Sequence, residues 1–187
     1  MRAPRTDGAD TVFDEEPLDG ATTIVRRGRR TDAERVIERL GELGWSVGVA
    51  ESLTGGLLTA ALVEVPGASA CVRGGVIAYD SAIKHSLLGV DADFLAEHGA
   101  VQPKVARQMA DGVRDALAIG GGRADVGVST TGIAGPASPD GQPVGTVHIA
   151  VSTALGTRVE SALFEGGRAE IREQTVRRAL WLLLEAL

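Results

Sequence analysis

Apolar residues alternate with small or polar residues in five short stretches of the chain, a spacing typical of β-strands. The strands predicted in this way cover residues 45–49, 73–79, 124–130, 144–152 and 157–164. Six other stretches repeat apolar residues every three or four positions, as helices do, over 31–43, 57–63, 80–88, 91–97, 104–118 and 168–187. Strands and helices alternate until the last two strands, which are close enough to form a hairpin. The pattern therefore predicts one layered α/β domain with a mixed, mostly parallel sheet, helices packed on it, and a C-terminal hairpin plus helix.

Residues 1–30 follow neither pattern. They contain prolines, an acidic run and an arginine cluster, with few apolar side chains to bury. We expect a disordered or loosely attached tail here, and a folded domain over residues 31–187.

Composition narrows the class of protein. Of the 187 residues, 44% are hydrophobic but only 3% aromatic, so the core must be aliphatic. The net charge of −6 argues against a general nucleic-acid binder. A single cysteine and three scattered histidines predict neither a disulfide nor a metal site, and nothing indicates a cofactor. The chain has no long apolar run and no apolar signal core, so we expect a cytoplasmic protein without a membrane segment.

Two predicted strands end in polar, glycine-rich corners. The first corner is Glu51-Ser52-Leu53-Thr54-Gly55-Gly56, and the second includes Thr131 and Gly132. In open α/β sheets, ligands bind where such strand ends converge, and a helix start adds free N–H groups. Ser52 and Thr54 can instead simply cap the following helix. The pair of corners favours a ligand site.

A serine hydroxyl needs a base before it can attack a substrate. Lys84 and Tyr79, around the end of the second strand, are the candidates, and a lysine can serve if burial lowers its pKa. A rival pattern, Ser81-x-x-Lys84, matches penicillin-binding serine hydrolases, but the other motifs of that class are missing from the sequence. Arg168 and Arg172, one turn apart at the start of the last helix, can clamp a phosphate or carboxylate.

Several ordered motifs resemble one family. They are AESLTGG at 50–56, VPGAS at 65–69, GGVIAY at 74–79, HGAV at 98–101, TGIAGP at 131–136, PVGTV at 143–147, and Gly167-Arg168 with Ile171-Arg172. Together they resemble the C-terminal domain of the competence/damage-inducible protein CinA. That family includes stand-alone nicotinamide mononucleotide amidohydrolases, and the chain leaves no room for the larger N-terminal domain, so the stand-alone form is expected.

The resemblance implies hydrolysis of the carboxamide of nicotinamide mononucleotide, a small nucleotide, to nicotinate mononucleotide and ammonia. Ser52 matches the family nucleophile, with Tyr79 and Lys84 as its activating partners. The expected substrate-binding residues are Glu51, Thr54, Gly55, Gly56, Thr131, Gly132, Arg168 and Arg172. No metal is required, and a homodimer is expected.

Three departures from the family pattern bear on this prediction. Leu53 replaces a cysteine, Ser81 replaces an asparagine, and the loop at 137–143 is shorter than the family's acidic version. Two alternatives therefore stay open. One is a non-catalytic nucleotide-binding or regulatory domain, and the other is a hydrolase that works through Ser81 and Lys84.

Overall fold

The computed structural model describes residues 30–138 and 141–187. The tail predicted for residues 1–30 therefore lies outside the described residues, except for Arg30. In chain order the elements are α1 (Asp32–Leu43), β1 (Val47–Glu51), α2 (Leu57–Val63), the short 3-10 helix η1 (Ala68–Ala70), β2 (Val72–Ile77), α3 (Ser81–Leu88), α4 (Ala92–His98), α5 (Pro103–Ala116), β3 (Val126–Gly132), β4 (Thr146–Thr153), β5 (Gly156–Leu163) and α6 (Arg168–Glu185).

Five strands form one sheet in the order β2-β1-β3-β4-β5. β2, β1 and β3 pair in parallel, whereas β4 runs antiparallel to both β3 and β5. β5 consequently points the same way as β3. The carboxyl ends of β1, β2 and β3 meet at one edge of the sheet, where ligands bind in open α/β sheets.

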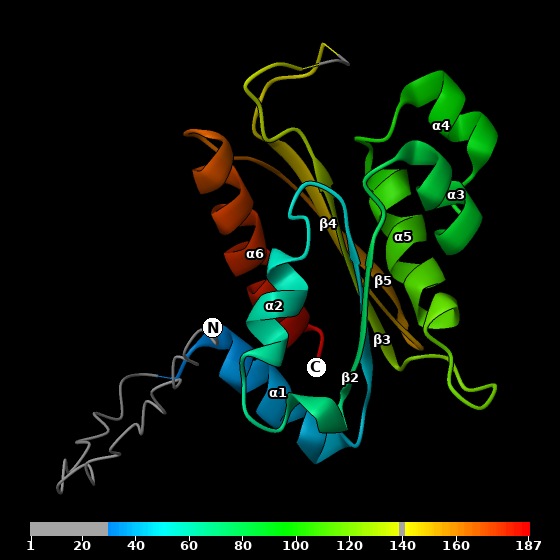
Figure 1. The fold of residues 1–187 in the computed structure, drawn as a ribbon, viewed down its shortest axis with the longest axis vertical. Coiled ribbons are helices and arrows are strands. Elements are labelled where there is room, and N and C mark those ends of the chain that lie inside the picture. Colours follow the sequence, from blue (N-terminus) through cyan, green and yellow to red (C-terminus); the bar gives the residue numbers. More distant parts are fainter. Residues whose placement is uncertain (1–29, 139–140) are drawn as a thin grey trace, which may run out of the picture.

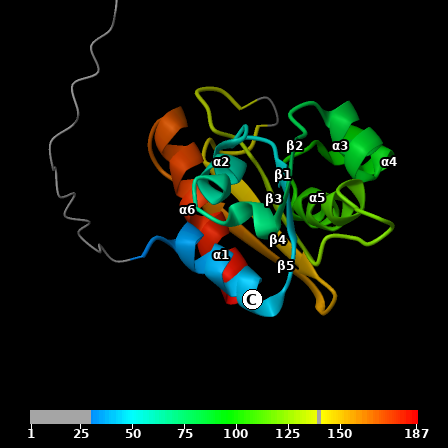
Figure 2. The same ribbon diagram turned by 60° about the horizontal axis from the view of Figure 1, so that its bottom comes forward.

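Helices cover both faces of the sheet (Figure 1; Figure 2). α1, α2 and α6 pack on one face around an aliphatic core that includes Leu40, Leu58 and Ile171. α3 and α5 pack on the other face, around Met109 and Val113. Because β1 and β3 lie between the two layers, their residues are buried almost throughout, as expected for strands covered on both sides.

The predicted fold class is confirmed: the structure is a mixed α/β sheet with a C-terminal hairpin and helix. One boundary differs in a way that affects the site. The third strand extends to Gly132, because Thr131 and Gly132 pair with His148 and Val147 of β4. In the described part of the chain, no helix is long and apolar enough to cross a membrane.

Candidate active site

Ser52 stands at the corner between β1 and α2. Its N–H donates to the carbonyl of Thr130 at 3.0 Å, which continues the pairing of β1 with β3 one residue beyond the strand. Gly55 and Gly56 then turn the chain with φ of 58° and 100°, a region that other residues rarely adopt. The corner therefore holds the Ser52 hydroxyl at the carboxyl edge of the sheet.

Glu51 is the last residue of β1, and its side chain reaches the start of α2. Its side chain is fully buried and accepts hydrogen bonds from the N–H groups of Gly56 (2.9 Å), Leu58 (3.1 Å) and Thr59 (2.8 Å), and from the Thr59 hydroxyl (2.6 Å). The sequence predicts that this helix start offers its N–H groups to a ligand and that Glu51 contacts the substrate. That expectation needs correction, because the carboxylate of the chain itself takes these donors.

We expect Glu51→Ala to lower the free energy of unfolding by about 3 kcal/mol, because it strips several buried N–H groups of a charged acceptor. Denaturant titration followed by circular dichroism measures the change. The control is Glu42→Ala, which removes an exposed carboxylate paired with Arg39 and should cost less than about 1 kcal/mol. Equal stability of the two variants would contradict a structural role for Glu51.

Lys84 lies on α3, and its ammonium reaches the corner. The residue is only 1% exposed, and Nζ lies 3.1 Å from Ser52 Oγ. Nζ also donates to the carbonyls of Ala78 (2.7 Å) and Tyr79 (3.3 Å). Burial lowers the pKa of Lys84 from 10.5 to about 8, while the nearby Asp80 carboxylate opposes the shift. A large fraction of Lys84 is therefore neutral near pH 8.

The alternative pair, Ser81 and Lys84, is not joined by a hydrogen bond between the hydroxyl and Nζ. Ser81 is the first residue of α3 and is exposed, and Asp80 caps that helix by accepting from the N–H of Ala82. Among the described residues, the one side-chain hydroxyl that bonds to Lys84 Nζ is that of Ser52. The geometry favours Ser52 as the nucleophile.

Ser52 and Lys84 line a cavity of about 360 Å³ at the carboxyl edge of the sheet. Apart from these two residues, its walls consist of Leu53, Tyr79, Ser81, Gly99, Ala100, Val101, Thr131, Gly132, Ile133, Ala134, Gly135, Ala137 and Arg168. The volume is that of a small-molecule site, and the walls are mostly small and apolar with a few polar groups, as such sites usually are.

Tyr79 lines the same cavity as Ser52 and Lys84, but its hydroxyl bonds to neither of them. Its hydroxyl receives a hydrogen bond from Arg168 Nη2 at 3.2 Å, and its side chain is 62% exposed. Only its main-chain carbonyl contacts Lys84. The structure thus joins the Tyr79 hydroxyl to Arg168 at the start of α6, and a role of Tyr79 in activating Ser52 stays a prediction.

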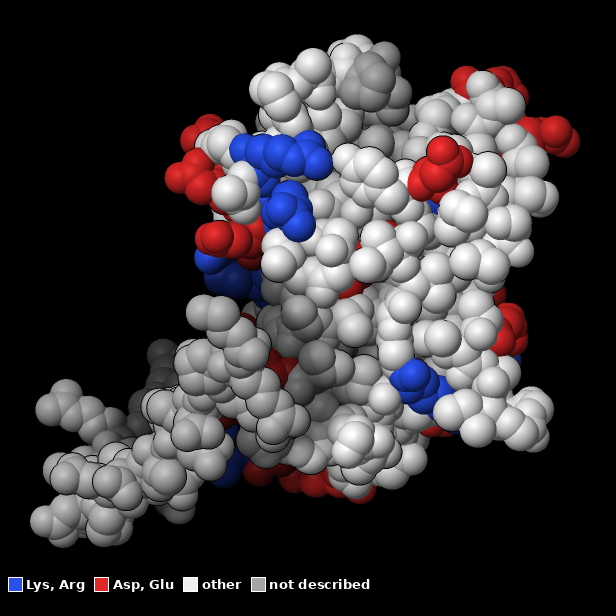
Figure 3. Space-filling model, in the orientation of Figure 1, with Lys and Arg blue, Asp and Glu red and all other residues white. Residues whose placement is uncertain are grey.

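Arg168 and Arg172 have different positions although they share a helix face. Arg168 lines the cavity and donates to the carbonyl of Gly135 at 2.8 Å. Arg172 lies outside the cavity wall, with its guanidinium on the main chain of the Ser52 corner. Positively charged side chains gather over the start of α6 in Figure 3. Of the two arginines, only Arg168 lines the cavity.

The threonines of the two corners also differ in whether they line the cavity. Thr54 is buried, and its hydroxyl bonds to that of Thr130 at 2.7 Å, tying β1 to β3 behind the site. Thr131 lines the cavity and donates to the carbonyl of Ala100 at 2.9 Å. Gly132 lines the cavity too, whereas Thr54, Gly55 and Gly56 do not, so their predicted contact with substrate is not supported by the structure.

The wall formed by Gly99, Ala100 and Val101 was not assigned a role from the sequence. These residues belong to the motif HGAV, which contributed to the family resemblance and was the available signal. Thr131 and Gln142 fix this wall through the carbonyls of Ala100 and Val101. Gln142 belongs to the loop in which this chain departs from the family, so the departure reaches the cavity wall.

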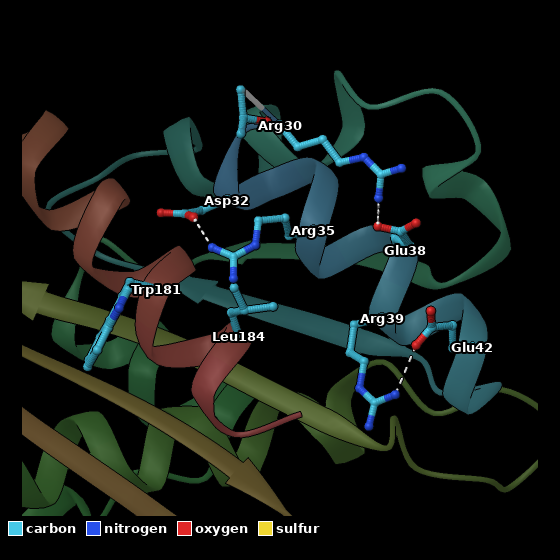
Figure 4. A pocket seen from close by; sticks show the side chains of 9 residues that line it. Arg30, Asp32, Arg35, Glu38, Arg39, Glu42, Trp181 and Leu184 are labelled. Atoms are coloured by element: carbon cyan, nitrogen blue, oxygen red, sulfur yellow. Dashed lines mark hydrogen bonds and ion pairs between the residues drawn. The ribbon is translucent and has the colours of Figure 1, made fainter. Parts of the chain in front are cut away.

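A larger cavity of about 1110 Å³ lies elsewhere, between α1 and α6 (Figure 4). Its lining consists of ion-paired surface residues such as Arg39 and Glu42, with Trp181 and Leu184 of α6. It contains neither a nucleophile–base pair nor a buried charge. Within 30–138 and 141–187, no group of three or more His, Cys, Asp or Glu side chains is arranged to hold a metal ion.

Residues 29–187 match the family described as the CinA C-terminal domain. The chain belongs to this family. It is 47% identical over 154 residues to a CinA-like protein of Anaeromyxobacter sp. (strain Fw109-5). The aligned segment covers 81% of this chain but 36% of that relative. The chain therefore spans about a third of the length of the curated relatives that it matches.

Solved structures of CinA proteins share the fold. A CinA superfamily protein from Klebsiella pneumoniae 700603 is 32% identical with a TM-score of 0.77, over 82% of this chain and 94% of that one. The competence/damage-inducible protein CihA from Agrobacterium tumefaciens is 38% identical with a TM-score of 0.72, over 83% of this chain and 96% of that one. The family resemblance of the sequence is thus confirmed.

Proposed function

We propose that this CinA C-terminal domain is a nicotinamide-nucleotide amidase that hydrolyses the carboxamide of nicotinamide mononucleotide. The observation that carries the proposal is the buried contact between Ser52 Oγ and Lys84 Nζ at 3.1 Å, inside a cavity of small-molecule size. A binding domain needs no buried amine beside a hydroxyl, and burying one is costly. The identity of the proposed substrate is taken from the family resemblance.

The bonding around Lys84 suits a general base. An amine without its extra proton has two N–H donors and one lone pair. The carbonyls of Ala78 and Tyr79 can accept only hydrogen bonds, so they take the two donors. The lone pair is then left for Ser52 Oγ, where it can accept the hydroxyl proton.

In the proposed reaction, Ser52 Oγ attacks the carboxamide carbon while its proton passes to Lys84 Nζ. Lys84 then gives this proton to the departing nitrogen, the C–N bond breaks, and ammonia leaves an acyl ester on Ser52. Water attacks the ester with Lys84 as the base, and the returning proton restores the Ser52 hydroxyl. Nicotinate mononucleotide is released, and no electron acceptor is needed.

Arg168 suits the phosphate end of such a substrate. It uses one N–H for Gly135 and another for Tyr79, and a guanidinium carries five donors, so several are left for phosphate oxygens. The apolar residues that line the cavity, such as Val101 and Ile133, suit a flat ring. We place this reaction in the cytoplasm and expect a homodimer, as the sequence analysis does.

The test is the release of ammonia and nicotinate mononucleotide from nicotinamide mononucleotide by the purified protein, followed by chromatography. We expect turnover without added metal. Binding of the nucleotide with no release of ammonia would instead support the non-catalytic nucleotide-binding domain.

We expect kcat/KM to rise with pH and to level off above about pH 8. The base must be neutral, and the pKa of Lys84 is about 8, so below that pH the protonated fraction grows. The rate should fall about tenfold for each pH unit below the pKa, as for a single essential base. Initial rates between pH 5.5 and 9.5 measure the profile. A rate that is flat across this range would contradict proton transfer to Lys84.

A further inference from the structure

We infer that Arg172 is a positioning residue for the nucleophile, one that holds the main chain after Ser52 instead of binding the substrate phosphate. Arg172 Nε donates to the carbonyl of Leu53 at 2.9 Å, and Nη2 donates to the carbonyl of Thr54 at 2.9 Å. One planar guanidinium thus fixes two successive peptide groups, Leu53–Thr54 and Thr54–Gly55, which begin one residue after Ser52.

Among the described residues, no ion pair accounts for the position of the Arg172 guanidinium. Among the ion pairs between described residues, none includes Arg172. Its residue is partly buried, so its two carbonyl partners supply much of what it loses from water. A charged donor to a carbonyl is also stronger than a neutral one, which makes the contact effective at restraining a loop.

The corner needs such a restraint. Between β1 and α2 the chain passes through two glycines with positive φ, which add conformational freedom next to the nucleophile. Glu51 fixes the far side of the corner by holding Gly56 and the first turn of α2. Arg172 fixes the near side from α6, more than a hundred residues away in the sequence. The chain that follows Ser52 is therefore anchored at two successive segments.

The peptide group just before the two that Arg172 holds carries an N–H that bears on catalysis. The carbonyl of Ser52 accepts from Gly55 N–H at 3.1 Å inside the turn. The N–H of Leu53 belongs to the same planar peptide group, so it points away from the turn, and the described residues supply no acceptor for it. An N–H directly after a nucleophile can stabilise a developing oxyanion. By holding the carbonyl of Leu53, Arg172 keeps this residue in place.

The inference rests on the proposed nucleophile, so its first test avoids the proposed substrate. A neutral fluorophosphonate probe labels an activated serine: Ser52 Oγ bonds to phosphorus, fluoride leaves and the hydroxyl proton goes to Lys84. We expect Arg172→Gln to slow labelling of Ser52 about 30-fold, since small misplacements of a reacting group cost up to about 10²-fold. Arg172→Lys, which keeps one charged donor, should lie between it and wild type. The matched control, Arg177→Gln, changes an exposed arginine of the same helix that does not line the cavity, and it should label at nearly the wild-type rate.

Two further readouts separate positioning from phosphate binding and from general stability. Added guanidinium ion should partly restore labelling of Arg172→Ala. With nicotinamide mononucleotide, Arg172→Gln should lower kcat and change KM less than about threefold, whereas Arg168→Gln should raise KM.

Wild-type labelling rates in Arg172→Gln together with a raised KM would overturn the inference and make Arg172 a phosphate ligand. Loss of the native circular-dichroism signal in both Arg172→Gln and Arg172→Lys would overturn it as well. If wild type is labelled at Ser52 but releases no ammonia, the amidase proposal fails while the labelling comparison still decides the role of Arg172. Absence of labelling in wild type would overturn both.

Discussion

Ser52→Ala should abolish release of ammonia from nicotinamide mononucleotide, with kcat lower by a factor on the order of 10⁴ to 10⁶, as when other serine nucleophiles are removed. The variant lacks the atom that forms the acyl ester, and no other hydroxyl in the described residues bonds to Lys84 Nζ. The fold should persist, because the change removes a single oxygen at the edge of the sheet. Single-turnover assays, with circular dichroism as the check on folding, measure both quantities.

Ser81→Ala is the matched control for Ser52→Ala. Ser81 lines the same cavity and stands three residues before Lys84, but its side chain is exposed and makes no hydrogen bond to Lys84 Nζ. We expect this variant to keep most of its activity. The reverse result, in which Ser81→Ala is inactive and Ser52→Ala is active, would favour the Ser-x-x-Lys alternative.

Lys84→Met should lower kcat/KM by about 10³-fold, within the range that a general base contributes. Methionine fills the buried site of Lys84 with a similar volume but cannot accept the Ser52 proton. The residual rate should lose the rise toward pH 8 that wild type shows. Initial rates across the same pH range measure both effects.

Two further variants test whether the effect of Lys84→Met is due to the loss of a base. Lys84→Arg keeps a positive charge and its donors to Ala78 and Tyr79, but a guanidinium stays protonated, so we expect it to be as inactive as Lys84→Met. Lys104→Met removes a lysine that is paired with Asp91 at the surface, and it should retain activity. Activity in Lys84→Arg would show that Lys84 supplies charge and does not accept a proton.

Much of the fold was predictable because periodicity reports which face of an element is buried. The repeat through Val36, Ile37 and Leu40 located α1, and the capping box at Thr31 located its start. The strand boundary at Gly132 was missed. Whether a residue beyond an apolar stretch still pairs depends on the neighbouring strand, here Val147 and His148 of β4, and local sequence does not contain that information.

Some of the residues that line the cavity could be predicted from the sequence, but the directions of the side chains could not. The sequence placed Ser52 just after the first strand and Lys84 just inside the helix that follows the second, and the parallel pairing of β1 with β2 brings these two positions together. It could not show that Glu51 turns back into α2, that Tyr79 turns toward Arg168, or that Arg172 reaches the main chain. Each of these depends on contacts between distant segments, which a motif does not record.

The tight connection between β4 and β5 has a practical consequence. Because β4 runs antiparallel to β3, Ser152 pairs with Gly127 near the beginning of β3, which puts this turn at the end of the sheet remote from Ser52. At its tip, Leu155 is 94% exposed. A cysteine introduced there would accept a fluorophore or a surface tether while the catalytic end of the molecule stays open to solution, so immobilised single molecules could be observed during turnover.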